Sequence, residues 1–214
     1  MSPACVLFDL DGTLIDHFRA IHRCHAHAMT QLGLPAPTLD QVRAAVGGGV
    51  ELAVERLVGK ERSAQALAIY RPHWTTTMLD DVELLTGARE LLTALRQRGT
   101  RTAVFTNKHG PSSRLVCAHL GLAELLDGNF GATDTPWLKP APEFTHHVLS
   151  ALHAAPATTV LVGDSPYDYQ AARNAGLTFL GVTTGTHSAA ELRAAGAEKV
   201  FADLHAVARE LGTG

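Results

Sequence analysis

The sequence predicts an α/β fold in which helices flank a parallel sheet, with a small all-helical insert after the first strand. Three observations lead to this prediction. Short apolar runs that end in polar residues recur along the 214-residue chain, at 4–8, 102–105 and 159–162. Helical patterns alternate with strand patterns from about residue 84 onward, which is typical of βαβ units and a parallel sheet. Between residues 16 and 83 the apolar residues follow helical spacing, and no convincing strand pattern occurs.

The insert, residues 16–83, is expected to contain four helices. Thr38 can cap the second helix through its hydroxyl, and the run Gly47-Gly48-Gly49 separates the second helix from the third. The predicted helices cover about 17–32, the residues behind Thr38, 50–58 and about 62–79. Clustered histidines in the first helix are interpreted as part of a polar helix face: His17, His22, His25 and His27.

The rest of the chain, residues 1–15 and 84–214, is expected to form the α/β core. Predicted helices cover 88–98, 111–120, 142–153, 166–175, 189–195 and 203–211. Predicted strands cover 101–105, a short piece around Phe130, 159–162, 178–182 and 199–201. Because parallel strands end at one edge of a sheet, the polar residues that follow them can meet in one crevice.

Composition and charge narrow the function classes. The net charge is −3 at pH 7 and no run of Lys or Arg occurs, so nucleic acid is not expected as a partner. Three widely spaced cysteines argue against a disulfide framework. No stretch has the pattern of a signal peptide or of a membrane span. We therefore expect a soluble cytoplasmic protein without a membrane partner, and the sequence leaves open whether it is a monomer or a homodimer.

Two aspartates follow the first strand. Asp9 comes directly after the apolar run 4–8, and Asp11 follows it across a turn that Gly12 permits. A carboxylate can act as a nucleophile toward phosphorus, and a neighbouring one can act as general acid and then as general base. We predict these roles for Asp9 and Asp11, and we expect crowding by other acids to raise the pKa of one carboxylate in the cluster.

A second acidic pair follows the strand at 159–162. If Asp164 comes close to Asp9, their oxygens suit Mg²⁺, which needs only one or two protein carboxylates besides water and substrate oxygens. Asp168 is expected to act through water or to orient a neighbour. The sequence thus predicts Mg²⁺ as the cofactor.

Anion-binding groups are predicted at two further points. Thr106 and Asn107 end the strand at 102–105, where a hydroxyl and backbone N–H groups can bind phosphate. Lys139 lies in a stiff Lys-Pro-Ala-Pro loop, where its ammonium group can contact phosphate as a point charge. Lys108 is a competing candidate for that contact.

In this order, the four segments resemble the four motifs of the haloacid dehalogenase (HAD) superfamily of hydrolases. They are Asp9-Leu-Asp-Gly-Thr13, Thr106-Asn107, Lys139-Pro-Ala-Pro142 and Gly163-Asp-Ser-Pro-Tyr-Asp168. Within the superfamily the chain is similar to phosphoglycolate phosphatases and their relatives. The resemblance implies a Rossmann-like core, with the insert as a helical C1 cap. His17 departs from the pattern, since many relatives carry Ser or Thr there.

The resemblance also implies a role for each site residue. Asp9 would be the nucleophile and Asp11 the acid and base. Thr106 and Lys139 would hold the phosphoryl group. The magnesium ligands would be Asp9, the Asp11 carbonyl and Asp164.

The predicted function is magnesium-dependent hydrolysis of a small phosphomonoester, phosphoglycolate-like or a sugar phosphate, through an aspartyl-phosphate. The expected partner is therefore a small phosphorylated metabolite. Alternatives are a phosphomutase of the β-phosphoglucomutase type and a catalytically idle binding or regulatory module, whereas a dehalogenase would leave Asp11 without a task. We further predict that the loop Gly47-Gly48-Gly49 faces the substrate, because glycine lets backbone approach a ligand closely.

Overall fold

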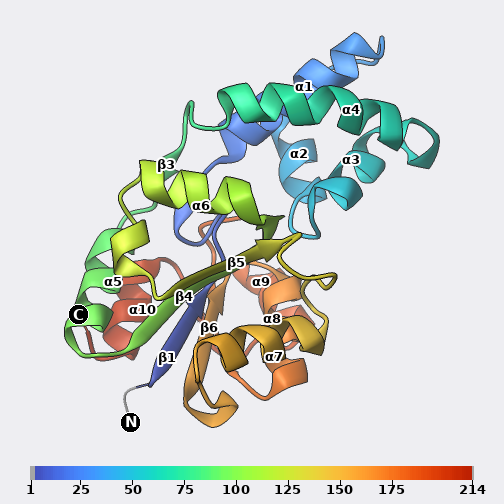
Figure 1. The fold of residues 1–214 in the computed structure, drawn as a ribbon. Helices are drawn as coiled ribbons and strands as arrows, with labels where there is room; N and C mark the ends of the chain where they lie inside the picture. Colours follow the sequence, from blue (N-terminus) through green and yellow to red (C-terminus); the bar gives the residue numbers. More distant parts are fainter. Residues whose placement is uncertain (1–2, 214) are drawn as a thin grey trace.

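The computed structural model of the protein describes residues 3–213. A six-stranded sheet with strand order β5-β4-β1-β6-β7-β8 lies at its centre (Figure 1). Each pair of neighbouring strands is parallel. The strands are β1 (Cys5–Phe8), β4 (Arg101–His109), β5 (Gly128–Ala132), β6 (Thr159–Gly163), β7 (Thr178–Val182) and β8 (Val200–Phe201). The predicted α/β fold with a parallel sheet is confirmed.

Helices cover both faces of this sheet, and β1 explains why. Val6 and Phe8 belong to an apolar cluster with residues of α5 and α10, whereas Cys5 and Leu7 belong to a cluster with residues of α7 and α8. Successive side chains of a strand point to opposite faces, so a strand buried on both faces is apolar throughout. The helices around the sheet are α5 (Ala88–Gln97), α6 (Gly110–His119), α7 (Pro142–Ala151), α8 (Pro166–Ala175), α9 (Ala189–Ala195) and α10 (Leu204–Glu210), with short 3₁₀ helices at Ala123–Leu125 and Pro156–Thr158.

The insert forms a separate group of four helices, called the helical region below, at the top of Figure 1. These helices are α1 (Phe18–Gln31), α2 (Leu39–Ala45), α3 (Val50–Val58) and α4 (Lys60–Thr77). Thr38 caps α2 as expected, since its Oγ1 accepts a hydrogen bond from the Gln41 N–H at 3.2 Å. The region has its own apolar cluster, which includes Ile21, Tyr70 and Trp74. Within residues 3–213, no helix has the length and apolar character that crossing a bilayer requires.

A small antiparallel ribbon joins the helical region to the sheet. It pairs β2 (Ile15–Asp16) with β3 (Glu83–Leu84). These strands were not expected from the sequence, because two residues are too few for an alternating pattern to show. The chain thus leaves and returns at neighbouring points, and the expected division at residues 15/16 and 83/84 crosses this ribbon.

Strand β4 continues beyond the point where the sequence predicted its end. Phe105 pairs with Phe130 and His109 pairs with Ala132. The chain therefore advances four residues along β4 where it advances two along β5. The extra residues form a bulge, which redirects side chains at the end of a strand. Thr106, Asn107 and Lys108 therefore lie in an irregular strand end, beyond the end that the sequence predicted at residue 105.

Candidate active site

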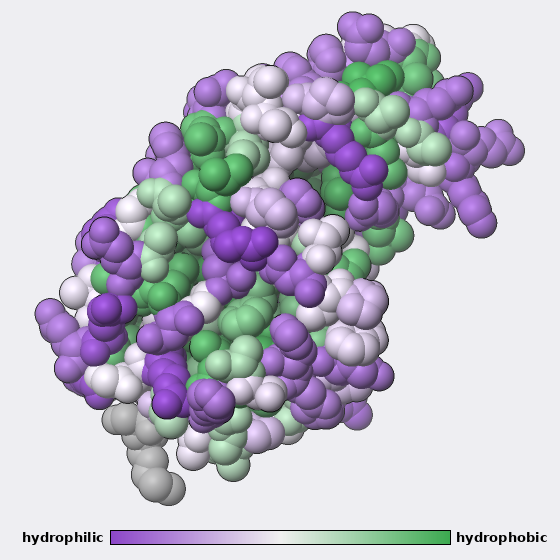
Figure 2. Space-filling view, in the orientation of Figure 1, coloured by the Kyte–Doolittle hydropathy of each residue, from purple (hydrophilic) through white to green (hydrophobic). Residues whose placement is uncertain are grey.

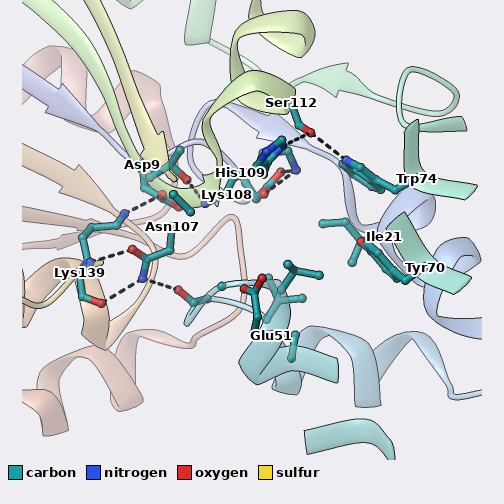
Figure 3. Close-up of a pocket in the computed structure, with 18 of the residues that line it drawn as sticks. Asp9, Ile21, Glu51, Tyr70, Trp74, Asn107, Lys108, His109, Ser112 and Lys139 are labelled. Carbon is teal, nitrogen blue, oxygen red and sulfur yellow. Dashed lines mark hydrogen bonds and ion pairs between the residues drawn. The ribbon is translucent and has the colours of Figure 1, made fainter. Parts of the chain in front are cut away.

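The C-terminal ends of β1, β4 and β6 meet at a pocket of about 430 Å³ between the sheet and the helical region (Figure 3). Its wall on the sheet side is called the floor below, and its wall on the helical region is called the roof. Residues predicted from the sequence make up much of the lining: Asp9, Asp11, Gly47, Gly49, Thr106, Asn107, Lys139 and Asp164. Asp168 and Gly48 do not line it.

Lys139 is the centre of a buried ion cluster in the floor. Its Nζ donates to Asp9 Oδ1 at 2.7 Å, to Asp168 Oδ1 at 2.6 Å and to the Phe105 carbonyl at 2.8 Å. Burial by itself would lower the pKa of Lys139, but the charges of Asp168 and Asp9 outweigh it and raise that pKa. The three ammonium donors are thus committed, and Lys139 is held as a cation against Asp9.

Carboxylates outnumber cations in this cluster. Burial, to which the charge of Asp168 adds, raises the pKa of Asp9 to about 6 although Lys139 opposes it. Burial together with the charges of Asp9 and Asp168 raises the pKa of Asp164 to about 8. The raised pKa that crowding was expected to cause therefore belongs to Asp9 and Asp164.

The donor set suits a hard divalent cation. Oxygens of Asp9, Asp164 and Asp168 lie within 4.8 Å of one another, and a cation there would offset the repulsion that raises the pKa values of Asp9 and Asp164. The two Asp168 oxygens are occupied, Oδ1 by Lys139 and Oδ2 by Ser165. This leaves Asp9 and Asp164 as the carboxylates that could hold a metal.

A loop after β7 packs directly on Asp164. Oδ2 of Asp164 accepts hydrogen bonds from the Thr186 N–H at 2.7 Å and from Thr186 Oγ1 at 2.9 Å. Gly12 has a φ of +84°, and a Cβ atom there would lie 2.6 Å from Gly185 Cα and 2.9 Å from Asp164 Oδ2. The turn after β1 therefore needs glycine both for its backbone conformation and for this close approach.

Asp11 points away from the other acids, toward Lys108. Lys108 Nζ donates to both Asp11 oxygens, at 3.0 and 2.9 Å. Burial acts to raise the pKa of Asp11, but Lys108 and His17 outweigh it and hold that pKa well below its usual range. The structure therefore differs from the expectation of a crowded, proton-holding Asp11, because a lysine from β4 reaches it and the neighbouring acids do not.

His17 connects Asp11 with the end of the helical region. Its Nε2 lies 2.6 Å from the Met78 carbonyl, so this nitrogen must carry a hydrogen to donate. Its Nδ1 faces Asp11 Oδ1 at 3.4 Å and has no hydrogen-bond partner among residues 3–213. His17, the residue before α1, is fully buried, and His25 within α1 is also buried against Tyr70. The interpretation of the histidines as one polar helix face is thus wrong for these two.

The three residues after Phe105 have different surroundings. Thr106 is buried and its Oγ1 accepts from the Lys108 N–H at 3.2 Å, which leaves its hydroxyl hydrogen free to donate into the pocket. Asn107 donates to the carbonyls of Gly47 and Lys139 and accepts from the Lys139 N–H. Both amide hydrogens of Asn107 are therefore in use, so a phosphate contact from this side chain would break an existing hydrogen bond.

The glycine loop connects the helical region to the core. Gly47 accepts the hydrogen bond from Asn107 at 3.1 Å, and Gly47 and Gly49 line the pocket. A Cβ at Gly48 would lie 2.9 Å from the Tyr167 hydroxyl and 2.5 Å from Leu52 Cδ2. Gly48 therefore packs between α3 and α8, away from the pocket to which the prediction assigned it.

The roof is apolar and aromatic. Tyr70 and Trp74 of α4 are stacked, with ring centroids 5.9 Å apart and planes 14° apart. Trp74 Nε1 donates to Ser112 Oγ at 3.1 Å. Figure 3 shows Ile21, Tyr70 and Trp74 on the side of the pocket opposite Asp9 and Lys139. In Figure 2 the outer surface of the helical region is largely hydrophilic, and apolar atoms are visible toward the sheet.

Sequence reasoning missed several lining residues. Lys108 was considered only as a phosphate ligand, although it pairs with Asp11. Thr186 follows β7, so the rule that polar residues after a strand reach the site could have identified it. The roof residues gave no comparable signal, because apolar residues at helical spacing look the same whether they face a core or a pocket.

Known proteins resemble this chain in sequence and in fold. The protein family described as Haloacid dehalogenase-like hydrolase matches residues 6–182. The phosphoglycolate phosphatase of Rhodobacter capsulatus is 34% identical over 191 residues, which cover 86% of this chain and 86% of that protein. The crystal structure of a predicted phosphoglycolate phosphatase from Haemophilus somnus superposes with a TM-score of 0.92 at 22% identity and covers 98% of both chains. That likeness concerns the fold.

A relative that is named as a kinase matches over a similar number of residues. The tyrosine-protein kinase PtkA of Mycobacterium tuberculosis is 31% identical over 176 residues, which cover 82% of this chain. The match spans 60% of the length of PtkA.

Proposed function

The chain belongs to the haloacid dehalogenase-like hydrolase family, and we propose that it is a magnesium-dependent phosphatase that hydrolyses a small phosphomonoester through an aspartyl-phosphate. The observation that carries the proposal is the buried Asp9 carboxylate, held by Lys139 at the floor of the pocket beside Thr106 and Asp164. A phosphatase needs a nucleophile, an anion site and a metal site within reach of one phosphoryl group. These residues offer all three.

The first half-reaction transfers the phosphoryl group to Asp9. Lys139 holds Asp9 Oδ1, which leaves Oδ2 to attack phosphorus. The bond from phosphorus to the ester oxygen breaks, and that oxygen takes a proton from Asp11. Asp11 is ionised in the resting pocket, so it first takes the proton of the phosphate monoester monoanion and then passes this proton to the ester oxygen. The Thr106 hydroxyl donates to a phosphoryl oxygen, and Lys139 places its positive charge beside the phosphoryl group, where a direct contact requires it to exchange one of its three present hydrogen bonds.

The second half-reaction releases phosphate. Asp11 takes a proton from water, the water oxygen attacks phosphorus, and the bond to Asp9 breaks. The cation would be held by Asp9, Asp164 and the Asp11 carbonyl, and when bound it would neutralise charge on the phosphoryl oxygens. Asp168 keeps Lys139 in place. We also propose that residues 16–83 act as a cap over the core of 1–15 and 84–214, which excludes bulk water during transfer.

Phosphate release from a panel of phosphomonoesters, with Mg²⁺ or with excess EDTA, tests the proposal. We expect turnover that needs Mg²⁺ and binding of beryllium fluoride, an acyl-phosphate mimic, to the wild type and not to the Asp9→Asn variant. Full activity in EDTA would refute metal dependence. Substantial activity of Asp9→Asn would refute the aspartyl-phosphate.

Phosphate release, together with tyrosine phosphorylation by ATP and binding of phosphoesters, separates the alternatives. A phosphomutase would return the phosphoryl group to a sugar phosphate and release little phosphate. A kinase, as the name of the relative PtkA suggests for that protein, would label tyrosine in the presence of ATP. A catalytically idle module would bind phosphoesters without turnover.

A further inference from the structure

The floor and the roof of the pocket differ in chemistry, and the roof surrounds whatever group the phosphate is attached to. Charged groups gather at the floor around Asp9, Lys139 and Asp164. The roof presents Ile21, Val50, Ala53, Tyr70 and Trp74 from α1, α3 and α4. At about 430 Å³ the pocket lies in the range of ~300–1,000 Å³ that encloses drug-sized ligands. It therefore has room for much more than a phosphoryl group with two carbons.

Two cations that line the pocket, Arg71 and Lys108, already have carboxylate partners. Arg71 Nη2 donates to Glu51 Oε1 at 2.6 Å at the pocket rim, and both side chains are exposed. Lys108 is bound to both oxygens of Asp11. A carboxylate-bearing leaving group that approaches either cation would thus also lie near the carboxylate of Glu51 or of Asp11, which repels it.

The histidine nearest the roof adds no positive charge. His25 is 3% exposed and lies against Tyr70, with ring centroids 4.7 Å apart. Its burial, with a contribution from His22, lowers the pKa of His25 to about 4. Near neutral pH its ring is an uncharged flat surface beside Tyr70.

The aromatic surface is held rigidly. The Trp74 N–H is committed to Ser112 Oγ, which also lies 3.0 Å from His109 Nδ1. Trp74 also lies against His17, with ring centroids 5.0 Å apart. Because its N–H already has a partner, Trp74 offers a substrate only apolar and π contact. Rings fixed by their neighbours bind a flat apolar group at little cost in conformational entropy.

From these contacts we propose that the preferred substrates carry an uncharged leaving group with an apolar, ring-sized body, and that carboxylate-bearing esters such as phosphoglycolate are poor substrates. This inference rests on the proposed phosphatase activity and specifies its substrate class. The apolar body would lie against Tyr70 and Trp74, with the phosphoryl group at Asp9 and Lys139.

The test compares esters whose leaving groups are all primary alcohols, so that leaving-group reactivity differs little. The probes are benzyl phosphate, 2-phenylethyl phosphate, ethyl phosphate and 2-phosphoglycolate, assayed for phosphate release with Mg²⁺. We expect kcat/KM for the two aryl esters to exceed that for ethyl phosphate and phosphoglycolate by at least about 10-fold, since even one methylene in an apolar pocket gives about 10-fold discrimination or more.

Variants of the roof then separate packing from charge. Trp74→Leu should lower kcat/KM for the aryl esters by roughly 10-fold more than that for ethyl phosphate, because only the aryl esters have a ring to pack against Trp74. Val50→Arg places a cation in the roof and should raise phosphoglycolate turnover relative to ethyl phosphate, whereas Val50→Gln, which is polar and uncharged, should not. Leu115→Ala, at an exposed side chain on α6, is the control.

The outcomes distinguish the two proposals. If Mg²⁺-dependent turnover occurs but phosphoglycolate equals or exceeds the aryl esters, this inference is wrong and the phosphatase proposal stands. If none of the esters is hydrolysed, the phosphatase proposal fails and this inference fails with it. Unfolding temperatures of the variants show whether each is folded. If Trp74→Leu does not fold, the comparison of Val50→Arg with Val50→Gln tests the inference.

Discussion

The floor and the roof of the pocket are built on opposite principles. In the floor, each charged side chain is fixed by others: Lys139 uses three donors, and Asp168 accepts from both Lys139 and Ser165. In the roof, Tyr70 and Trp74 provide shape and apolar surface, and the Trp74 N–H is already bonded to Ser112 Oγ. The difference indicates that the floor determines which reaction occurs, whereas the roof determines which ester undergoes it. Substitutions in the two regions should therefore have separable effects.

The largest effect is expected at the floor. Asp9→Asn keeps the size of the side chain but removes the attacking charge, so turnover should fall by at least about 10³-fold. The loss should be equal for every ester in a panel, because the residue contacts the phosphoryl group common to all of them. A loss confined to some esters would contradict the separation of floor and roof. Phosphate release under single-turnover conditions measures it.

A second floor prediction concerns metal and pH together. The folded-state pKa values of Asp9 and Asp164 are raised from 3.8 to about 6 and about 8. A raised carboxyl pKa means that the folded state binds protons more tightly than the unfolded state. Proton binding therefore stabilises the folded state fully below about pH 4, and this stabilisation is lost as the pH rises toward 8. In EDTA, the contribution of Asp9 and Asp164 to the unfolding temperature should therefore fall over this range, against the opposite contribution of His25, and Mg²⁺ should reduce the fall.

Asp164→Asn is the matched variant for that measurement. An amide cannot titrate, so the variant should show a flatter dependence of unfolding temperature on pH in EDTA and a smaller gain on adding Mg²⁺. An unchanged pH dependence in Asp164→Asn would mean that the cluster does not control it. Differential scanning calorimetry at several pH values supplies both numbers.

A smaller effect is expected at His17, which lies between Asp11 and the Met78 carbonyl. His17→Gln keeps a donor where Nε2 contacts the Met78 carbonyl, and His17→Asn keeps a polar atom where Nδ1 faces Asp11. We expect His17→Gln to lose roughly 10-fold in kcat with little loss of stability, since Lys108 still holds Asp11. His17→Asn should lose more stability than kcat. If both variants changed kcat and stability equally, His17 would have no role in orienting Asp11.

The smallest effect is expected at the glycine loop. A Cβ at Gly48 would press on Leu52 and on the Tyr167 hydroxyl, and overpacking of this kind costs about 1–3 kcal/mol. Gly48→Ala should therefore lower the unfolding temperature and leave the ranking of esters unchanged. A changed ranking would restore the prediction that Gly48 itself faces the substrate.

The floor could be predicted from the sequence, and the roof could not, for a physical reason. Buried parallel strands such as β1 and β6 are short apolar runs whose polar ends must reach one edge of the sheet, so their sequence pattern is enough to pair Asp9 with Asp164. Trp74 and Tyr70 lie on an ordinary helix pattern, and nothing in that spacing states which apolar side chains face a ligand. The bulge in β4 was also hidden, because its register depends on β5 and not on local residues.

The burial of strand β1 also affects which parts of the protein open first. It lies between β4 and β6, its four residues have no exposed surface, and the Asp9 N–H continues its ladder by donating to the Val162 carbonyl at 2.9 Å. Backbone amides in such a position exchange with deuterium only when the whole domain opens. The amides of α3 and α4, which pack outside the sheet, can exchange through local opening. A partly opened molecule would thus lose its selectivity for the ester while Asp9 and Lys139 remain assembled.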